Sequence, residues 1–334
     1  MEHDPAAASR LDIGRIQAIW PPLLFVLIAG LALTVILGEL PGRPLILHVL
    51  QKLAHPGVFG VIALSVLLLE RQRAGAPRAV AREYLVALLA AVTVGGLTEI
   101  GQLFTHRDPS LRDVGLDARG AAVALCLAAA FDRRCRPDAG AAWWRALYLA
   151  AGLALMAAIL TPLAWTVAGY ANRSHRFPVL FEPTSRLDLL FVSLGGSPSE
   201  RIAVPAAYAR SAGETALRVP LSARPTAGVW LDEPIPDWSG RRTLLVEVTN
   251  PGHSALDLQV RIHDRSHNFA ADDRFNAVRE IPPGTRVTLD FPLEAIASAP
   301  LTRRLDLRHV AGIALYRGGP DGPREFWLHR IELR

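Results

Sequence analysis

Five apolar stretches in the first half of the chain each approach the length that crosses a lipid bilayer. A helix needs about 20 predominantly apolar residues to span the hydrocarbon core. The stretches cover residues 19–40, 47–69, 84–104, 114–131 and 144–170. Asp117 and Arg119 lie in the first two turns of the fourth stretch, so neighbouring helices must cover that end. We therefore expect a bundle of five transmembrane helices, the first of them an uncleaved anchor.

Arginines are concentrated in alternate loops between these stretches. Lys and Arg near the ends of transmembrane helices are retained on the cytoplasmic side. The arginine-rich segments hold Arg10, Arg15, Arg71, Arg73, Arg78, Arg82, Arg133, Arg134, Arg136 and Arg145. The opposite loops hold Arg43, Arg107 and Arg112. This distribution predicts a multi-pass protein of the bacterial inner membrane with a cytoplasmic N-terminus. The net charge of +5 comes from these loops, so it does not indicate a nucleic-acid partner.

The second half of the chain has the pattern of an all-β domain. Short alternating runs, as at 243–249, 256–262 and 285–291, are separated by turn residues. Strands of this length between Pro- and Gly-rich turns are typical of an antiparallel β-sandwich or jelly roll. Cys126 and Cys135 are the two cysteines, so no disulfide framework is available to this half.

The chain is therefore expected to have four segments. They are a cytoplasmic N-terminal segment (1–18), a four-helix transmembrane domain (19–132), a cytoplasmic loop with the fifth helix (133–171), and an extracytoplasmic β-sandwich domain (172–334). With an odd number of spans, the β-sandwich emerges on the outer side of the membrane.

Four motifs of the second half resemble those of galactose-binding-like jelly rolls of the carbohydrate-binding-module type. They are AspTrpSerGly at 237–240, AsnPro at 250–251, PheProLeu at 291–293 and the run at 325–333. The resemblance implies glycan binding rather than glycan cleavage. Candidate flat faces for sugar rings are Trp230, Trp238 and Trp327, with Phe269 and Phe275 as further aromatics. The alternative is that most of these rings fill the core.

One polar loop has residue types that bind metal ions. It contains His263, Asp264, His267, Asp272 and Asp273. Their spacing matches no closed calcium or zinc site. We therefore expect a solvated polar loop, and neither a metal nor a cofactor.

Polar residues gather at the predicted outer ends of the second, third and fourth helices. Each helix contributes one pair spaced three or four residues apart, which places the pair on one helix face. The pairs are Lys52 with His55, Glu99 with Gln102, and Asp113 with Asp117. Arg107, Asp108 and Arg112 occupy the link between the third and fourth helices, at the same expected depth.

This set of positions resembles the VanZ-like family of membrane proteins over residues 18–132. The matching positions are Lys52, His55, Glu99, Gln102, Arg107, Asp113, Asp117 and Gly120. Asp117 stands where the family has Asn, which adds a negative charge. The family takes its name from a connection with glycopeptide antibiotic resistance, and the resemblance implies a membrane protein of the cell envelope.

Two interpretations of the polar cluster remain open. In the first, its charges form an ion-paired girdle that locks the helices together. In the second, it is a binding pocket at headgroup depth, with Lys52 and Arg107 placed for a phosphate. Glu99, Gln102 and Asp113 would then receive hydroxyl or amine groups, and Asp117 completes the set. His55 is a candidate proton carrier.

The pocket interpretation predicts a binding protein of the cell envelope. Its partner would be a membrane lipid, a lipid-linked envelope molecule or an antibiotic-like amphiphile, while the β domain binds glycan. The alternative is a membrane enzyme that acts by acid/base chemistry on a lipid-linked or polysaccharide substrate, with His55, Glu99 and Asp113 as catalytic candidates. The sequence has no nucleophile elbow, HExxH, P-loop or dinucleotide motif.

Overall fold

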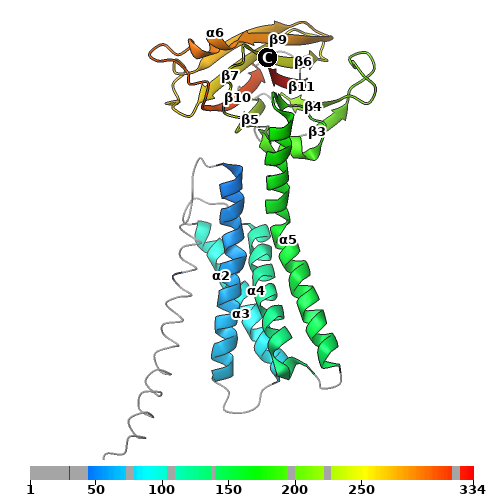
Figure 1. Cartoon of the computed structure of the whole chain (residues 1–334), viewed down its shortest axis with the longest axis vertical. Helices are drawn as coiled ribbons and strands as arrows, with labels where there is room; N and C mark the ends of the chain where they lie inside the picture. Colours follow the sequence, from blue (N-terminus) through cyan, green and yellow to red (C-terminus); the bar gives the residue numbers. More distant parts are fainter. Residues whose placement is uncertain are drawn as a thin grey trace, which may run out of the picture. The chain divides into compact units, whose positions relative to one another are not determined.

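The computed structural model describes residues 30, 44–72, 79–103, 110–136, 140–194, 200–221, 227–317 and 324–334 (Figure 1). The chain divides into two compact units, Met1–Ala164 and Trp165–Arg334. The predicted first span, 19–40, lies outside the described residues apart from position 30.

Four helices of the described residues are long and apolar enough to cross a membrane. They are α2 (Leu45–Gln72), α3 (Val80–Gln102), α4 (Leu111–Phe131) and α5 (Ala141–Arg176). Each corresponds to one predicted stretch. The prediction of five helices did not include α6 (Leu293–Ala297), a short helix of the β-rich unit.

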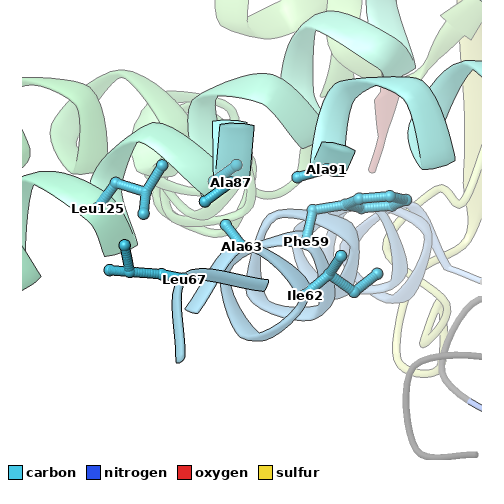
Figure 2. Close-up of a cluster of buried hydrophobic side chains, with 8 residues drawn as sticks. Phe59, Ile62, Ala63, Leu67, Ala87, Ala91 and Leu125 are labelled. Carbon is cyan, nitrogen blue, oxygen red and sulfur yellow. The ribbon is translucent and has the colours of Figure 1, made fainter. Parts of the chain in front are cut away.

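Helices α2, α3 and α4 share one apolar core (Figure 2). Phe59, Ile62, Ala63 and Leu67 of α2 meet Ala87 and Ala91 of α3 and Ala121 and Leu125 of α4. Large side chains come mainly from α2, while α3 presents alanines. Small residues let membrane helices approach closely. Such close packing drives their association, because helices in apolar lipid gain little from the hydrophobic effect.

Glycine sets the closest approach between α2 and α4. A Cβ atom at Gly120 would lie 2.2 Å from the carbonyl oxygen of Pro56 and 2.3 Å from its Cα. Gly60, one turn along α2, faces Gly120 and Ala124. Pro56 lies inside α2 and has no N–H for the helical hydrogen-bond ladder. The two helix backbones therefore touch beside the predicted polar cluster.

An ion-pair network joins the opposite ends of the same helices. Arg134 donates to Glu83 (Nη2 to Oε2, 2.9 Å), and Arg71 binds Asp132. Tyr84 also contacts the Asp132 carboxylate (3.3 Å). Glu83 is 2% exposed, so this network closes the end of the bundle with paired charges.

The described residues of the β-rich unit form two antiparallel sheets. Their strands are β1 (Val179–Phe181), β2 (Val192–Ser193), β3 (Glu200–Ala203), β4 (Thr215–Pro220), β5 (Gly228–Asp232), β6 (Thr243–Asn250), β7 (Leu256–Asp264), β8 (Phe275–Ile281), β9 (Thr285–Pro292), β10 (Val310–Arg317) and β11 (Glu325–Leu333). One sheet has the order β3-β4-β11-β6-β9, with β1 also paired to β11, and the other has the order β2-β5-β10-β7-β8.

The strand order is that of a jelly roll. From β4 to β11 the chain passes between the sheets so that β4, β6, β9 and β11 form one, and β5, β7, β8 and β10 form the other. Apolar side chains of both sheets meet between them, including Phe181, Val229, Leu231, Ile313 and Leu328. The predicted antiparallel β-sandwich is confirmed.

Candidate functional site

The helix ends bring the predicted polar pairs of three helices together. Lys52 Nζ lies 3.8 Å from Asp113 Oδ1, and His55 Nδ1 lies 3.5 Å from Asp117 Oδ1. The first pair is partly exposed, with 48% of the Lys52 side chain and 21% of the Asp113 side chain accessible. The second pair is buried. The cluster, comprising Lys52, His55, Glu99, Gln102, Asp113 and Asp117, therefore has an open side and an enclosed side.

Glu99 connects the end of α3 to the start of α4. Its Oε2 accepts the backbone N–H of Ser110 at 2.7 Å, and its Oε1 accepts from Gln102 at 3.3 Å. Ser110 is the N-cap of α4, and its hydroxyl accepts the N–H of Asp113. Sequence reasoning missed Ser110, although a Ser that precedes the first helical residue is a typical N-cap.

Asp117 is the most enclosed charged residue of the cluster. It is 1% exposed, and among the described residues neither carboxylate oxygen accepts a hydrogen bond. Gly95 of α3 leaves the space that it occupies, since a Cβ at Gly95 would lie 3.1 Å from Oδ2. His55 Nδ1 also has no hydrogen-bond partner among the described residues. Asp117 and His55 thus face each other without a formed hydrogen bond.

The other predicted members are placed differently. Arg107 and Asp108 lie outside the described residues. Glu99 and Asp113, two of the catalytic candidates, are engaged by Ser110 and Lys52. The carboxylate beside the third candidate, His55, belongs to Asp117. A proton exchanged within this cluster would therefore pass between His55 and Asp117.

Two of the three proposed glycan-platform tryptophans are buried. Trp238 is fully buried, and its Nε1 donates to the carbonyl of Ile235 at 2.8 Å. Trp327 is 8% exposed and packs edge-on against Tyr208. Neither ring offers a free face to a sugar, so the prediction was wrong for both. Phe275 is also buried, whereas Phe269 is 86% exposed.

Trp230 remains a platform candidate on the outer face of the second sheet. It is half-buried and lies opposite Ala314 in the β5–β10 register. Two residues further along β10, Tyr316 lies opposite Gly228 and on the same sheet face. A Cβ at Gly228 would lie 2.6 Å from Tyr316 Cβ, so only glycine fits there. Sequence reasoning missed Tyr316.

The polar loop is pinned by an arginine, which corrects the expectation of a solvated loop. Arg303 donates to both oxygens of Asp264 (2.6 and 2.8 Å) and also binds Asp273. These contacts hold the pKa of Asp273 at about 2. The described residues contain no group of three or more His, Cys, Asp or Glu side chains arranged to hold a metal ion.

A cleft of about 570 Å³ opens on the outer face of the first sheet. It is lined by Glu182, Thr184, Arg210, Ser211, Ala212, Gly213, Glu214, Thr215, Leu245, Glu247, Arg286, Thr288, His329, Arg330, Glu332 and Arg334. At its floor, Arg286 donates to Glu214 (2.5 Å) and lies 3.1 Å from Glu247. The hydrogen bond from Arg286 lowers the pKa of Glu214 to about 2. Sequence reasoning did not find this cleft.

His329 lies at the cleft wall and is 2% exposed. Its Nε2 lies 2.7 Å from the Thr249 hydroxyl. Burial, and then the positive charge of Arg286, lower its pKa to about 4. His329 is therefore neutral at pH 7.

Lowering the pH from 7 to 4.5 should destabilise the β-rich unit. The pKa of His329 is about 4 in the folded state and about 6.5 in an unfolded chain. As the pH falls, the unfolded state therefore binds a proton on this residue before the folded state does. Stability therefore falls as the pH drops from 6.5 to 4, by up to about 3 kcal/mol from this group. Hydrogen exchange of the full-length protein measures the loss. His329→Gln should flatten the pH dependence, and an unchanged slope in that variant would exclude His329 as its source.

Comparison with known proteins gives only distant similarities. No family model matches the chain, and no curated protein matches it. Among solved structures, a family 11 carbohydrate-binding module from Clostridium thermocellum, in complex with a β-1,3-1,4-mixed-linked tetrasaccharide, has 17% identity and a TM-score of 0.33 over 46% of this chain and 93% of that one. The CBM22-1 xylan-binding domain from Paenibacillus barcinonensis Xyn10C has 15% identity and a TM-score of 0.31 over 43% and 84%. An exo-β-agarase has 13% identity and a TM-score of 0.37 over 47% and 24%.

Proposed function

We propose that this chain is an integral membrane protein of the cell envelope whose polar cluster binds the polar head of an amphiphile. The observation that carries the proposal is Asp117, a buried carboxylate without a hydrogen bond among the described residues, in helices apolar enough to span a membrane. An ionisable side chain costs about 2.5 to 3.5 kcal/mol at the bilayer centre on insertion scales and less near the interface, and such residues usually serve a function. A bound head group would supply the missing partner.

The surroundings of the cluster suit an amphiphile. Lys52 and Asp113 form its accessible side, where a head group could enter. Leu50, Leu97, Ile100 and Leu103 belong to the same helix ends and are 44%, 60%, 56% and 56% exposed. Apolar side chains next to a polar cluster favour a ligand with both a polar head and an apolar tail. The resemblance of these positions to the VanZ-like family also supports an envelope role.

We place the cluster at the outer membrane–water interface and the β-rich unit outside the cytoplasm, because the arginine-rich loops belong to the opposite helix ends. An impermeant thiol reagent should not reach a cysteine introduced at position 75 from outside the cell. Labelling of that cysteine from outside would overturn the orientation.

The β-rich unit is proposed to bind glycan on the outer face of its second sheet. Trp230 and Tyr316 lie diagonally on adjacent strands, with Ala314 and Gly228 as small neighbours. Aromatic faces above a floor of small residues suit the apolar faces of sugar rings. Trp230→Ala should weaken neutral-glycan binding, and unchanged binding would exclude this platform.

A membrane enzyme that uses acid/base chemistry remains the second candidate. The observation that favours it is the 3.5 Å distance between His55 Nδ1 and Asp117 Oδ1 in a buried site. A carboxylate beside an imidazole can orient it and stabilise its protonated form. Asp117→Asn would then abolish turnover while the amphiphile still binds, whereas a binding protein has no turnover to lose.

Glu99→Gln distinguishes a binding pocket from an ion-paired girdle. In a pocket, the melting temperature of the detergent-solubilised protein should change little, while complementation of a deletion strain is lost. Glu83→Gln is the matched control, because Glu83 lies on the same helix, is equally buried and binds Arg134. Losing the two hydrogen bonds from Arg134 should cost about 2 kcal/mol, because Arg134 is 46% exposed and keeps Asp132 as a partner. If Glu99→Gln complements fully, the pocket is excluded; if it melts like Glu83→Gln, the cluster is a girdle.

A further inference from the structure

The cleft on the first sheet is separate from the proposed aromatic platform, which lies on the second sheet. Its walls come from the segment at 210–215 and from strands β6, β9 and β11. A cavity of about 570 Å³ accommodates several sugar units or a comparable ligand. Nothing in the proposed amphiphile site or the Trp230 platform accounts for it.

Arginines and glutamates alternate along the cleft in two groups. Arg210 and Arg286 both pair with Glu247, and Arg286 also binds Glu214. In the second group, Arg330 Nε lies 2.7 Å from Glu332 and its Nη1 lies 3.5 Å from Glu182. Every arginine of these groups is held by at least one carboxylate.

The arginine side chains are the more exposed members of these pairs. The side chains of Arg210 and Arg330 are 60% and 38% accessible. Glu247 and Glu332, which lie nearest to them, are each 12% accessible, and Glu182 is 30% accessible. Because a guanidinium has five N–H donors, a carboxylate beneath it leaves donors free to bind a ligand. The cleft therefore presents oriented positive groups although its formal charges balance.

The lining also limits the class of ligand. The described residues of the lining include no Trp, Tyr or Phe, so they give a neutral sugar ring no aromatic face to stack on. Leu245 and Ala212 are its apolar side chains, which is too little apolar surface to anchor a peptide through its side chains. Hydroxyl groups come from Thr184, Ser211 and Thr288. Hydroxyls and oriented guanidinium groups suit a ligand that is rich in both hydroxyl and carboxylate groups.

We propose that this cleft binds an acidic polysaccharide, with Arg210 and Arg330 receiving its carboxylates and the hydroxyl side chains binding its sugar oxygens. The inference rests on the proposed glycan-binding role of the β-rich unit and names a ligand class for a second site on it. Guanidinium–carboxylate pairs give directional, charge-assisted hydrogen bonds.

The test compares two polymers that share one backbone and differ in charge. Full-length protein in lipid nanodiscs is titrated with polygalacturonate and with its fully methyl-esterified form. Wild-type protein should bind the acid at least tenfold more tightly than the ester, and the preference should weaken as salt is raised. Arg210→Gln with Arg330→Gln should abolish the preference. The matched control, Arg304→Gln with Arg308→Gln, removes two exposed arginines outside the cleft and should retain it.

Three outcomes would overturn the inference. Equal binding of both polymers by the wild type would mean that the cleft does not recognise charge, while glycan binding would stand. An equal loss in the control variant would mean that the preference reflects the overall charge of the protein. Failure of both polymers to bind would also overturn this inference, and retained binding of neutral glycans at Trp230 would show that the proposed function survives it.

Discussion

Gly120→Ala is expected to break the packing of α2 against α4. The added methyl group would lie 2.2 Å from the carbonyl oxygen of Pro56 and 2.3 Å from its Cα. Both contacts are with backbone, so no side-chain rotation relieves them and the helices must separate. Overpacking of a close-packed interior usually costs 1 to 3 kcal/mol, and backbone clashes lie at the upper end, about 3 kcal/mol. The melting temperature of the purified protein in detergent measures the effect, and we expect a fall of roughly 6 to 12 °C.

Gly115→Ala is the control for this substitution. Gly115 lies on the same helix, five residues earlier, and a Cβ there would meet no atom of the described residues within 4 Å. The control should be neutral or slightly stabilising, since alanine favours helix more than glycine does. Equal melting temperatures for the two variants would mean that α2 and α4 do not approach each other at Gly120.

Arg303→Leu is expected to destabilise the β-rich unit by about 3 kcal/mol. Arg303 donates to both oxygens of Asp264, whose side chain is fully buried, and it also binds Asp273. Among the described residues, removing the guanidinium leaves a buried carboxylate whose donors are the backbone N–H groups of Asp306 and Ser266. The loss is large because the remaining carboxylate stays desolvated without the positive charge that balanced it. Hydrogen exchange of β7 and β10 in the full-length protein measures the loss.

Arg304→Leu separates this effect from a simple change of charge. Arg304 is the next residue, its side chain is 63% exposed, and it pairs with Glu294, whose side chain is 78% exposed. Surface pairs of this kind contribute at most about 1 kcal/mol. Similar exchange rates in the two variants would contradict the role assigned to the Arg303 network.

The helices could be predicted from the sequence because a run of apolar residues is a local property, whereas their ends depend on contacts. α5 continues beyond the last apolar residues to Arg176. Its final turns are held within the β-rich unit, where the Tyr170 hydroxyl donates to Glu233 and Arg173 lies over the ring of Phe191. Hydropathy does not record such contacts, so the predicted end at residue 170 was early.

The members of the polar cluster could be predicted, but their partners could not. Residues three or four apart share a helix face whatever the tertiary structure. Which residue of one helix meets which residue of another depends on how the helices cross. Gly120 and Pro56 set that crossing for α2 and α4, and it brings His55 to Asp117 and Lys52 to Asp113.

The β-rich unit shows the same limit more strongly. Aromatic residues suit both the inner and the outer faces of a sheet, so residue type alone did not distinguish the buried Trp327 from the half-buried Trp230. The cleft joins Glu214, Arg286 and His329, which lie on segments far apart in the chain. The cleft could not be predicted without the strand order of the jelly roll, because a local sequence pattern does not show which strands are neighbours.

The most direct test of the amphiphile site is the lipid that remains with the protein after purification. Extraction and mass spectrometry should recover one amphiphile enriched over bulk membrane lipid, near one molecule per wild-type chain. Asp117→Asn should lower that occupancy, because it removes the carboxylate that the head group is proposed to bind, and Glu83→Gln, at the other end of the bundle, should not. Recovery of lipid in bulk membrane proportions from wild type and Asp117→Asn alike would contradict the proposed binding function.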